Sequence, residues 1–184
     1  MNQNKKVILI PGWMNMKGMY GSDFEVLEVW ADKLLPEKKI DADILIAHSL
    51  GCNWAVAAWE KNKAIRLILV NPLFPRRNIF RWFEKWREFH RKEKRPANKE
   101  VVCGLRNIIF AVKLCVRLLR KDFDATLSAL EKDKITVLCG ENDSFYCDKT
   151  LKDYLRSKNI TPVEVPGVGH DWHEKFAEEI RKII

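Results

Sequence analysis

A serine, three histidines and several aspartates stand at places in this chain where a short apolar run has just ended. Ser49 lies in "ILIAHSLGCNW", residues 44 to 54, after an apolar run and before a helix-forming segment. Two interpretations of Ser49 are open. Its hydroxyl caps the next helix by accepting backbone N–H groups, or the turn holds it up as a nucleophile that a neighbouring base activates.

The elements that must position these side chains follow from hydrophobic periodicity. Short apolar runs alternate with amphipathic stretches, a pattern typical of a parallel sheet covered by helices. Strands are predicted at 7–10, 44–47, 67–70, 135–138 and 162–165, and helices at about 22–35, 50–62, 148–157 and 172–183. The first helix is expected to begin with a capping box made by Ser22 and Glu25. At 184 residues the chain is most simply one domain, 1–184.

The polar residues fall at the C-terminal ends of the predicted strands. "PGWMN" follows the first strand, "HSLGC" the second, "CGENDSFYC" the fourth and "PGVGHDWH" the fifth. In open parallel sheets this edge is where ligands bind. We therefore expect these four segments to meet at one site.

Three of the segments resemble motifs of the α/β-hydrolases. "AHSLG" is similar to the G-x-S-x-G nucleophile elbow, "GENDS" to the acid loop and "GVGHDW" to the loop that carries the catalytic histidine, in the chain order of that family. The resemblance implies a reduced α/β-hydrolase fold with a mostly parallel sheet of about five or six strands flanked by helices. It also implies Ser49 as nucleophile, His170 as base and then acid, and Asp143 as the carboxylate that orients the imidazole.

The elbow brings neighbouring backbone close together, so small residues are expected two positions before and two positions after the serine. Here they are Ala47 and Gly51, and Ala47 departs from the usual glycine. The apolar Cys52 is expected to pack beneath the elbow, since it has neither a CxxC partner nor an obvious base.

An acyl-transfer site also needs donors for the developing oxyanion. By the same resemblance these are the backbone N–H groups of Leu50, which follows the serine, and of Trp13 in "PGW". Gly12 is expected to allow close approach to the substrate. With Gly12, the residues expected to bind substrate are Met14 and His48, and His48 is either a wall of the pocket or a buried, hydrogen-bonded residue.

Other residues compete for the acid and base roles. Asp148 and Asp171 are alternative acids, but Asp148 stands where a helix N-cap is expected and Asp171 directly follows the histidine. His173 is the alternative base, although it is expected one turn into the last helix. The preceding "GVG" suits a loop that delivers His170.

Residues 75–131, between the third and fourth predicted strands, differ in composition from the rest. From 76 to 121 there are fifteen Lys or Arg and four Glu, a net charge of +11 within a total of +8, so the remainder carries −3. We interpret this segment as a helical cap, broken at "RPAN". A helix at about 79–90 places an aromatic stripe on the core, and a helix at about 101–120 is expected to be largely buried. The stripe consists of Ile79, Trp82, Phe83, Trp86 and Phe89.

The basic face of this cap has two interpretations. It is a solvated surface, or it recruits an anionic partner, either a phospholipid surface or an acidic protein such as an acyl carrier. Nucleic acid is not the expected partner, because the aromatic residues share one stripe that the core can bury.

Cysteine usage and hydropathy narrow the class of protein. The five cysteines contain no CxxC pair and the N-terminal apolar run is short, which favours the reducing cytoplasm. No apolar run approaches the roughly 18 residues of a transmembrane helix.

The sequence thus predicts a serine hydrolase that cleaves a small-molecule carboxylic ester or thioester through an acyl-enzyme, without metal or cofactor. Two alternatives stay open. One is an esterase directed to acyl groups on an acidic carrier protein or a membrane lipid. The other is a binding protein that keeps the hydrolase fold but has lost turnover.

Overall fold

The computed structural model describes residues 5–76, 78–92 and 105–184. Within these residues, six parallel strands form one sheet in the order β2-β1-β3-β4-β5-β6. The strands are β1 Val7–Ile10, β2 Glu25–Val26, β3 Ile44–His48, β4 Arg66–Val70, β5 Ile135–Gly140 and β6 Val163–Val165. The five predicted strands are therefore confirmed, and the short β2 is an addition at the edge of the sheet.

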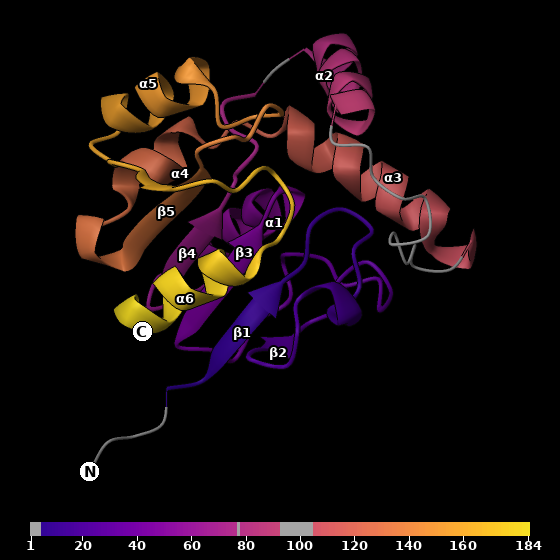
Figure 1. Cartoon of the computed structure of the whole chain (residues 1–184). Coiled ribbons are helices and arrows are strands. Elements are labelled where there is room, and N and C mark those ends of the chain that lie inside the picture. The colour runs from indigo at the N-terminus through magenta and orange to yellow at the C-terminus, as the bar shows by residue number, and fades with distance from the viewer. Residues whose placement is uncertain (1–4, 77, 93–104) are drawn as a thin grey trace.

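Each strand sends alternate side chains to the two faces of the sheet. Ile8 and Leu45 join the larger apolar cluster, whereas Leu9 and Ile46 join the smaller one. The helices α1 Leu50–Trp59 and α5 Lys149–Ser157 pack in the larger cluster, and α6 Glu174–Ile183 covers the opposite face (Figure 1). The sheet is thus the middle layer of three.

The strand order places a reversal between β1 and β3. From β1 the chain moves to β2 on one side, and it then returns to β3 on the other side of β1. The loops after β1 and β3 consequently part at the carboxyl edge of the sheet and leave room between them. Such a switch point is where open α/β sheets bind ligands.

The predicted helix at 22–35 is wrong. This region contains β2 and turns, and Glu25 lies in that strand rather than in a capping box. Phe24 packs in the smaller cluster, whereas Val29 and Trp30 pack in the larger one. The Trp30 indole also donates to the Pro11 carbonyl at 3.1 Å. Because its apolar side chains serve two different clusters, the segment cannot present them on one helical face.

In the described part of the connection from β4 to β5, where the sequence predicted the helical insertion, there are three α-helices. They are α2 Ile79–Lys92, α3 Leu105–Arg120 and the unpredicted α4 Asp124–Ala129. The predicted break at "RPAN" and residues 101–104 of the predicted second helix lie outside the described residues. Figure 1 shows α2 and α3 at one end of the molecule, beyond the carboxyl edge of the sheet. None of the helices in the described ranges combines the length and hydrophobicity that a membrane span requires.

Burial of these helices differs from expectation. Trp82 and Phe89 of α2 are buried, but Phe83 is 53% exposed. In α3, Ile109 is 70% and Val112 43% exposed, so this helix buries only one face. The predicted contact of the stripe is wrong at Phe83, and the prediction that the second helix is largely buried is wrong, because each helix has the core on only one side. The side chain of Ile79, the first residue of the stripe, lies outside the described part of the structure.

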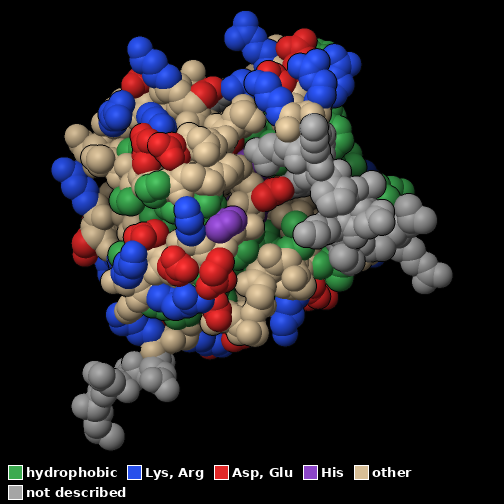
Figure 2. Space-filling model, viewed as in Figure 1, with side chains coloured by type: hydrophobic (Ala, Val, Ile, Leu, Met, Phe, Trp, Pro, Cys, Tyr) green, Lys and Arg blue, Asp and Glu red, His purple; other side chains and the backbone are tan. Residues whose placement is uncertain are grey.

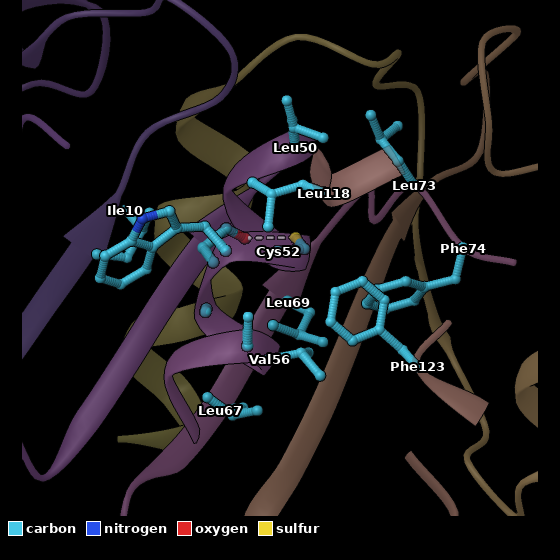
Figure 3. Close-up of a cluster of buried hydrophobic side chains, with 14 of the residues drawn as sticks. Ile10, Leu50, Cys52, Val56, Leu67, Leu69, Leu73, Phe74, Leu118 and Phe123 are labelled. Atoms are coloured by element: carbon cyan, nitrogen blue, oxygen red, sulfur yellow. Dashed lines mark hydrogen bonds between the residues drawn. The ribbon is translucent and has the colours of Figure 1, made fainter. Parts of the chain in front are cut away.

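The turn from β3 to α1 is a tight one. Ser49 alone joins the two elements and has a left-handed φ of 53°. Gly51 lies against the loop after β1, where an added Cβ would be 2.7 Å from the Ile10 carbonyl oxygen and 2.6 Å from that of Pro11. Cys52 lies beneath this turn within the core, and its thiol donates to the Ala47 carbonyl at 3.1 Å (Figure 3). The expectations of a small residue at 51 and of a buried Cys52 are confirmed.

Gly51→Ala should lower the free energy of unfolding by about 1 to 3 kcal/mol, because a methyl group would overlap backbone that cannot turn aside. Chemical denaturation measures this. Gly18→Ala is the control, since an added Cβ there has no heavy atom within 4 Å. A similar loss in both variants would contradict the close approach.

Candidate active site

The side chain of Ser49 does not cap the helix that follows it. Ser49 occupies the N-cap position of α1, but its side chain makes no capping hydrogen bond. Its Oγ instead lies 2.9 Å from Nε2 of His170, and its backbone N–H donates to the Val70 carbonyl at 2.9 Å. The strained turn therefore directs the hydroxyl towards an imidazole.

The other side of the imidazole contacts the predicted acid. Nδ1 of His170 lies 2.7 Å from Oδ2 of Asp143, and both residues are buried. The second carboxylate oxygen of Asp143 accepts the backbone N–H groups of Phe145 at 2.7 Å and Tyr146 at 3.0 Å. These bonds fix the carboxylate from two directions.

The charge of Asp143 follows from its surroundings. Burial by itself raises the pKa of this carboxyl, but the attraction of His170 and the hydrogen bonds from His170, Tyr146 and Phe145 outweigh it, so the pKa lies below its ordinary value. A carboxylate at Oδ2 accepts Nδ1–H, which leaves the lone pair of Nε2 facing Ser49. In this state the imidazole can take the serine proton, and the carboxylate stabilises the imidazolium that results.

Two of the residues considered as alternative acid or base, Asp148 and His173, cap helices instead. Asp148 caps α5 by accepting the Leu151 N–H at 3.1 Å, as predicted, and it also pairs with Lys85 at 2.7 Å. His173 is exposed and caps α6, accepting the Lys175 N–H at 3.1 Å. The expectation that His173 lies inside the helix is wrong, since α6 begins one residue later.

The remaining alternatives take no part in the described contacts of the imidazole with Ser49 and Asp143. Asp171 is half-buried beside His170, but Asp143 holds the ring nitrogen. Burial raises the pKa of the Cys52 thiol well above its ordinary value, so this cysteine stays protonated.

The predicted oxyanion donors lie on the two loops that part at the switch point. Leu50 is the first residue of α1, and its N–H has no carbonyl of the preceding helical turn to bond. In the other loop, the Gly12 N–H already donates to the Tyr20 hydroxyl at 2.7 Å. The next backbone N–H along this loop is that of Trp13, the predicted donor. Gly12 lies so close to the serine that an added Cβ would be 3.3 Å from the Ser49 Cβ.

A small cavity, about 50 Å³, opens beside Ser49 and His170. Its apolar wall is mainly aromatic and includes Trp13, Leu73, Trp82, Trp86, Phe89 and Phe145. His48 also lines it, and His48 is hydrogen-bonded through both ring nitrogens, so both expectations for this residue hold. Met14 packs against the larger core cluster and is not among the described lining residues.

Sequence reasoning missed several residues of this site. Phe145 packs edge-on against His170 with ring centroids 4.9 Å apart, and Asn71 donates to the His170 carbonyl. Asn71 directly follows β4, so the rule that polar residues after strands form the site would have found it. Tyr20 follows no strand and matches no motif, and no signal in the sequence marked it.

Comparisons with known proteins agree with this architecture. No family model matches the chain, and no curated protein matches it in sequence. Among solved structures, a thermophilic esterase from Thermogutta terrifontis is similar with a TM-score of 0.64 and 17% identity, covering 96% of this chain and 88% of that one. Carboxylesterase CesB from Bacillus subtilis gives 0.58 and 15%, covering 100% and 84%. A thioesterase domain from the curacin biosynthetic pathway gives 0.58 and 14%, covering 98% and 91%.

The similarity to these structures extends over nearly the whole chain. The chain also combines the parallel sheet, its switch point and the tight turn at Ser49. The chain therefore has the α/β-hydrolase fold, in a reduced form with a sheet of six strands among the described residues.

The lowered pKa of Asp143 predicts how acid affects stability. A carboxyl whose pKa is lower in the folded than in the unfolded chain stabilises the fold above the unfolded value, about 3.9, and this stabilisation is lost as the pH falls through the folded value. From about pH 5 to about pH 3, the wild type should thus lose more unfolding free energy than Asp143→Asn, in urea titrations. Asp32→Asn, at an exposed position, controls for general acid sensitivity. Parallel losses in wild type and Asp143→Asn would contradict the charged, hydrogen-bonded Asp143.

Proposed function

We propose that this protein is a serine hydrolase that cleaves a carboxylic ester or thioester. The observation that carries the proposal is the continuous, buried hydrogen-bonded chain from Ser49 Oγ through His170 to Asp143, with contacts of 2.9 and 2.7 Å. Esterases and a thioesterase among the structures of similar fold support it.

The proposed reaction has two halves. His170 Nε2 takes the Ser49 proton as Oγ attacks the acyl carbon, and the N–H groups of Leu50 and Trp13 stabilise the oxyanion. The imidazolium then protonates the departing alcohol or thiol, leaving an acyl group on Oγ. Water attacks this acyl-enzyme with His170 again as base, which releases the acid and restores the serine.

The cavity suggests the acyl group. Its walls are aromatic, and its volume of about 50 Å³ is far below the roughly 300 to 1,000 Å³ of pockets that hold drug-sized ligands. We propose that residues 75–131 act as a cap within one domain, 1–184, with α2 as the roof. A short apolar acyl chain suits this enclosure, and longer chains require α2 to move.

The alternative of a binding protein without turnover is less well supported. A silent hydrolase fold would be expected to show a serine turned away from the imidazole, or an imidazole without its carboxylate. Here both contacts are within hydrogen-bonding distance.

Ser49→Ala should lower ester turnover by about 10⁴- to 10⁶-fold and leave the fold intact, because nucleophile and base act as a unit. Hydrolysis of p-nitrophenyl acetate measures the turnover, and covalent labelling by a fluorophosphonate, mapped by mass spectrometry, identifies the nucleophile. Ser128→Ala, at an exposed serine of α4, is the matched control. Labelling of another residue, or wild-type turnover in Ser49→Ala, would refute the assignment.

A specific observation favours a membrane-directed version of this function. Phe80 and Phe83 of α2 are 75% and 53% exposed, and their spacing places them on the same face as the exposed Arg87 and Arg91. Figure 2 shows Lys and Arg side chains gathered at the end of the molecule where α2 lies. Exposed aromatic rings beside arginines suit an anionic lipid surface, because the rings enter the headgroup boundary while the guanidinium groups pair with phosphates. An acidic protein is the alternative partner, because aromatic rings and arginines also occur together at protein interfaces.

The variant Arg87→Glu/Arg91→Glu should weaken binding to phosphatidylserine-containing vesicles by at least about tenfold, and Phe80→Ser/Phe83→Ser should weaken it too. Turnover of p-nitrophenyl acetate should change little, and vesicle co-sedimentation measures the binding. Lys38→Glu/Lys39→Glu is the control, with an equal charge change at exposed positions away from α2. If the wild type does not bind anionic vesicles, or if the control variant loses as much binding as the arginine variant, the basic face is ordinary solvated surface.

A further inference from the structure

The backbone carbonyl of His170 accepts two buried side-chain hydrogen bonds. One comes from Nε2 of His48 at 2.8 Å and the other from Nδ2 of Asn71 at 2.8 Å. Both donors are essentially inaccessible to solvent, with 1% and 0% of their surface exposed. The histidine that faces Ser49 is therefore fixed through its backbone as well as through its ring.

Asn71 joins two loops by using both ends of its amide. Its NH₂ group donates to the carbonyls of Gly169 at 3.0 Å and His170, while its Oδ1 accepts the Gly140 N–H at 2.7 Å and the Cys147 thiol at 3.3 Å. These four contacts use the two donors and two lone pairs of an amide. Asn71 thus ties the histidine loop to the loop that carries Asp143.

The backbone conformation at Asn71 and the packing of Gly140 both allow this contact. Asn71 has a left-handed φ of 49°, a conformation that Asn tolerates better than most residues. Gly140 packs so closely on the carbonyls of Val168 and Gly169 that a side chain there has no room. The two loops are consequently pressed together where the Asn71 amide spans them.

His48 connects the histidine loop to the loop after β1. A carbonyl oxygen only accepts, so Nε2 of His48 carries the proton, and a neutral ring then accepts the Tyr20 O–H at Nδ1, 3.0 Å away. The Tyr20 oxygen in turn accepts the Gly12 N–H at 2.7 Å, next to the proposed oxyanion donor of Trp13. A single chain of hydrogen bonds therefore runs from the oxyanion loop to the backbone of His170.

We propose that Asn71, assisted by His48, is a positioning residue that sets the imidazole of His170 between Asp143 and Ser49. This inference rests on the proposed hydrolase function. Asn71 acts through the backbone of His170, because it contacts the His170 carbonyl and is not among the described residues that line the cavity. Small displacements matter here, since a shift of about 1 Å in reacting groups can lower a rate by about 10²-fold.

The test compares chemistry with stability. Asn71→Ala should lower kcat for p-nitrophenyl acetate, and the rate of fluorophosphonate labelling at Ser49, by about 10²-fold with little change in KM, because His170 is misplaced while the cavity stays. The Nδ1–H proton of His170, followed by NMR, should broaden. Ile160→Val, at a core residue that is not among the described residues lining the cavity, is the control for lost stability and should keep wild-type kcat when assayed well below its melting temperature.

A matched pair at position 48 keeps the test informative if Asn71→Ala fails to fold. His48→Gln retains an N–H donor for the His170 carbonyl, whereas His48→Leu has a similar volume and none. His48→Leu should lower kcat at least about tenfold, and His48→Gln should recover most of it. Unchanged kcat in a folded Asn71→Ala, or equal kcat in the two His48 variants, would overturn the inference. A wild type that is not labelled at Ser49 would instead refute the hydrolase itself.

Discussion

The site depends on one close contact, the packing of the β3–α1 turn against the end of β1. Gly51 meets the carbonyls of Ile10 and Pro11 at distances that exclude any side chain, and this contact lets Ser49 take up its left-handed conformation at the switch point. Because β1 and β3 are neighbours whose chains then leave in opposite directions, the serine stands beside the loop that carries Gly12 and Trp13. Strand order thus brings the proposed nucleophile and the proposed oxyanion donors together.

Strand ends were the part of the molecule that the sequence predicted best. A parallel strand that is buried on both faces reads as a continuous apolar run, and the residue after it must lie at the carboxyl edge of the sheet. Ser49 and Asp143 follow such runs, whereas His170 follows the mostly exposed edge strand β6, but all three lie beyond the carboxyl ends of predicted strands, so their meeting could be expected without knowing any packing. The helix predicted at 22–35 is wrong because the apolar residues of this segment divide between two clusters on opposite faces of the sheet. The spacing of apolar residues along the chain does not indicate which cluster each side chain joins.

Tyr20 and Asn71 show a second limit of sequence reasoning, because the position of Asn71 after β4 could be predicted but its partners could not, and nothing in the sequence marked Tyr20. Asn71 bonds to backbone groups of loops that are distant in sequence, and Tyr20 accepts the Gly12 N–H and contacts the His48 ring. A backbone N–H or carbonyl has the same appearance at every position of a sequence. The parts of a site that react are residue types with known chemistry, whereas the parts that hold them are identified only by what they touch. Gly140 belongs with them, since its need for glycine comes from the carbonyl of Gly169, a contact made across the sheet edge.

The helix α2 has two different faces, and their placement links the surface to the site. Inward, Trp82 and Phe89 close the cavity over Ser49 and His170 and keep it apolar, which strengthens electrostatic interactions inside it. Outward, the same helix presents Phe80, Phe83 and arginines. Its ion pair with the rest of the fold, Lys85 to Asp148, is partly exposed and therefore only modestly stabilising. Apolar contacts consequently contribute most to the packing of α2 against the fold. A membrane or protein surface that binds the outer rings of α2 therefore contacts the same helix that roofs the cavity.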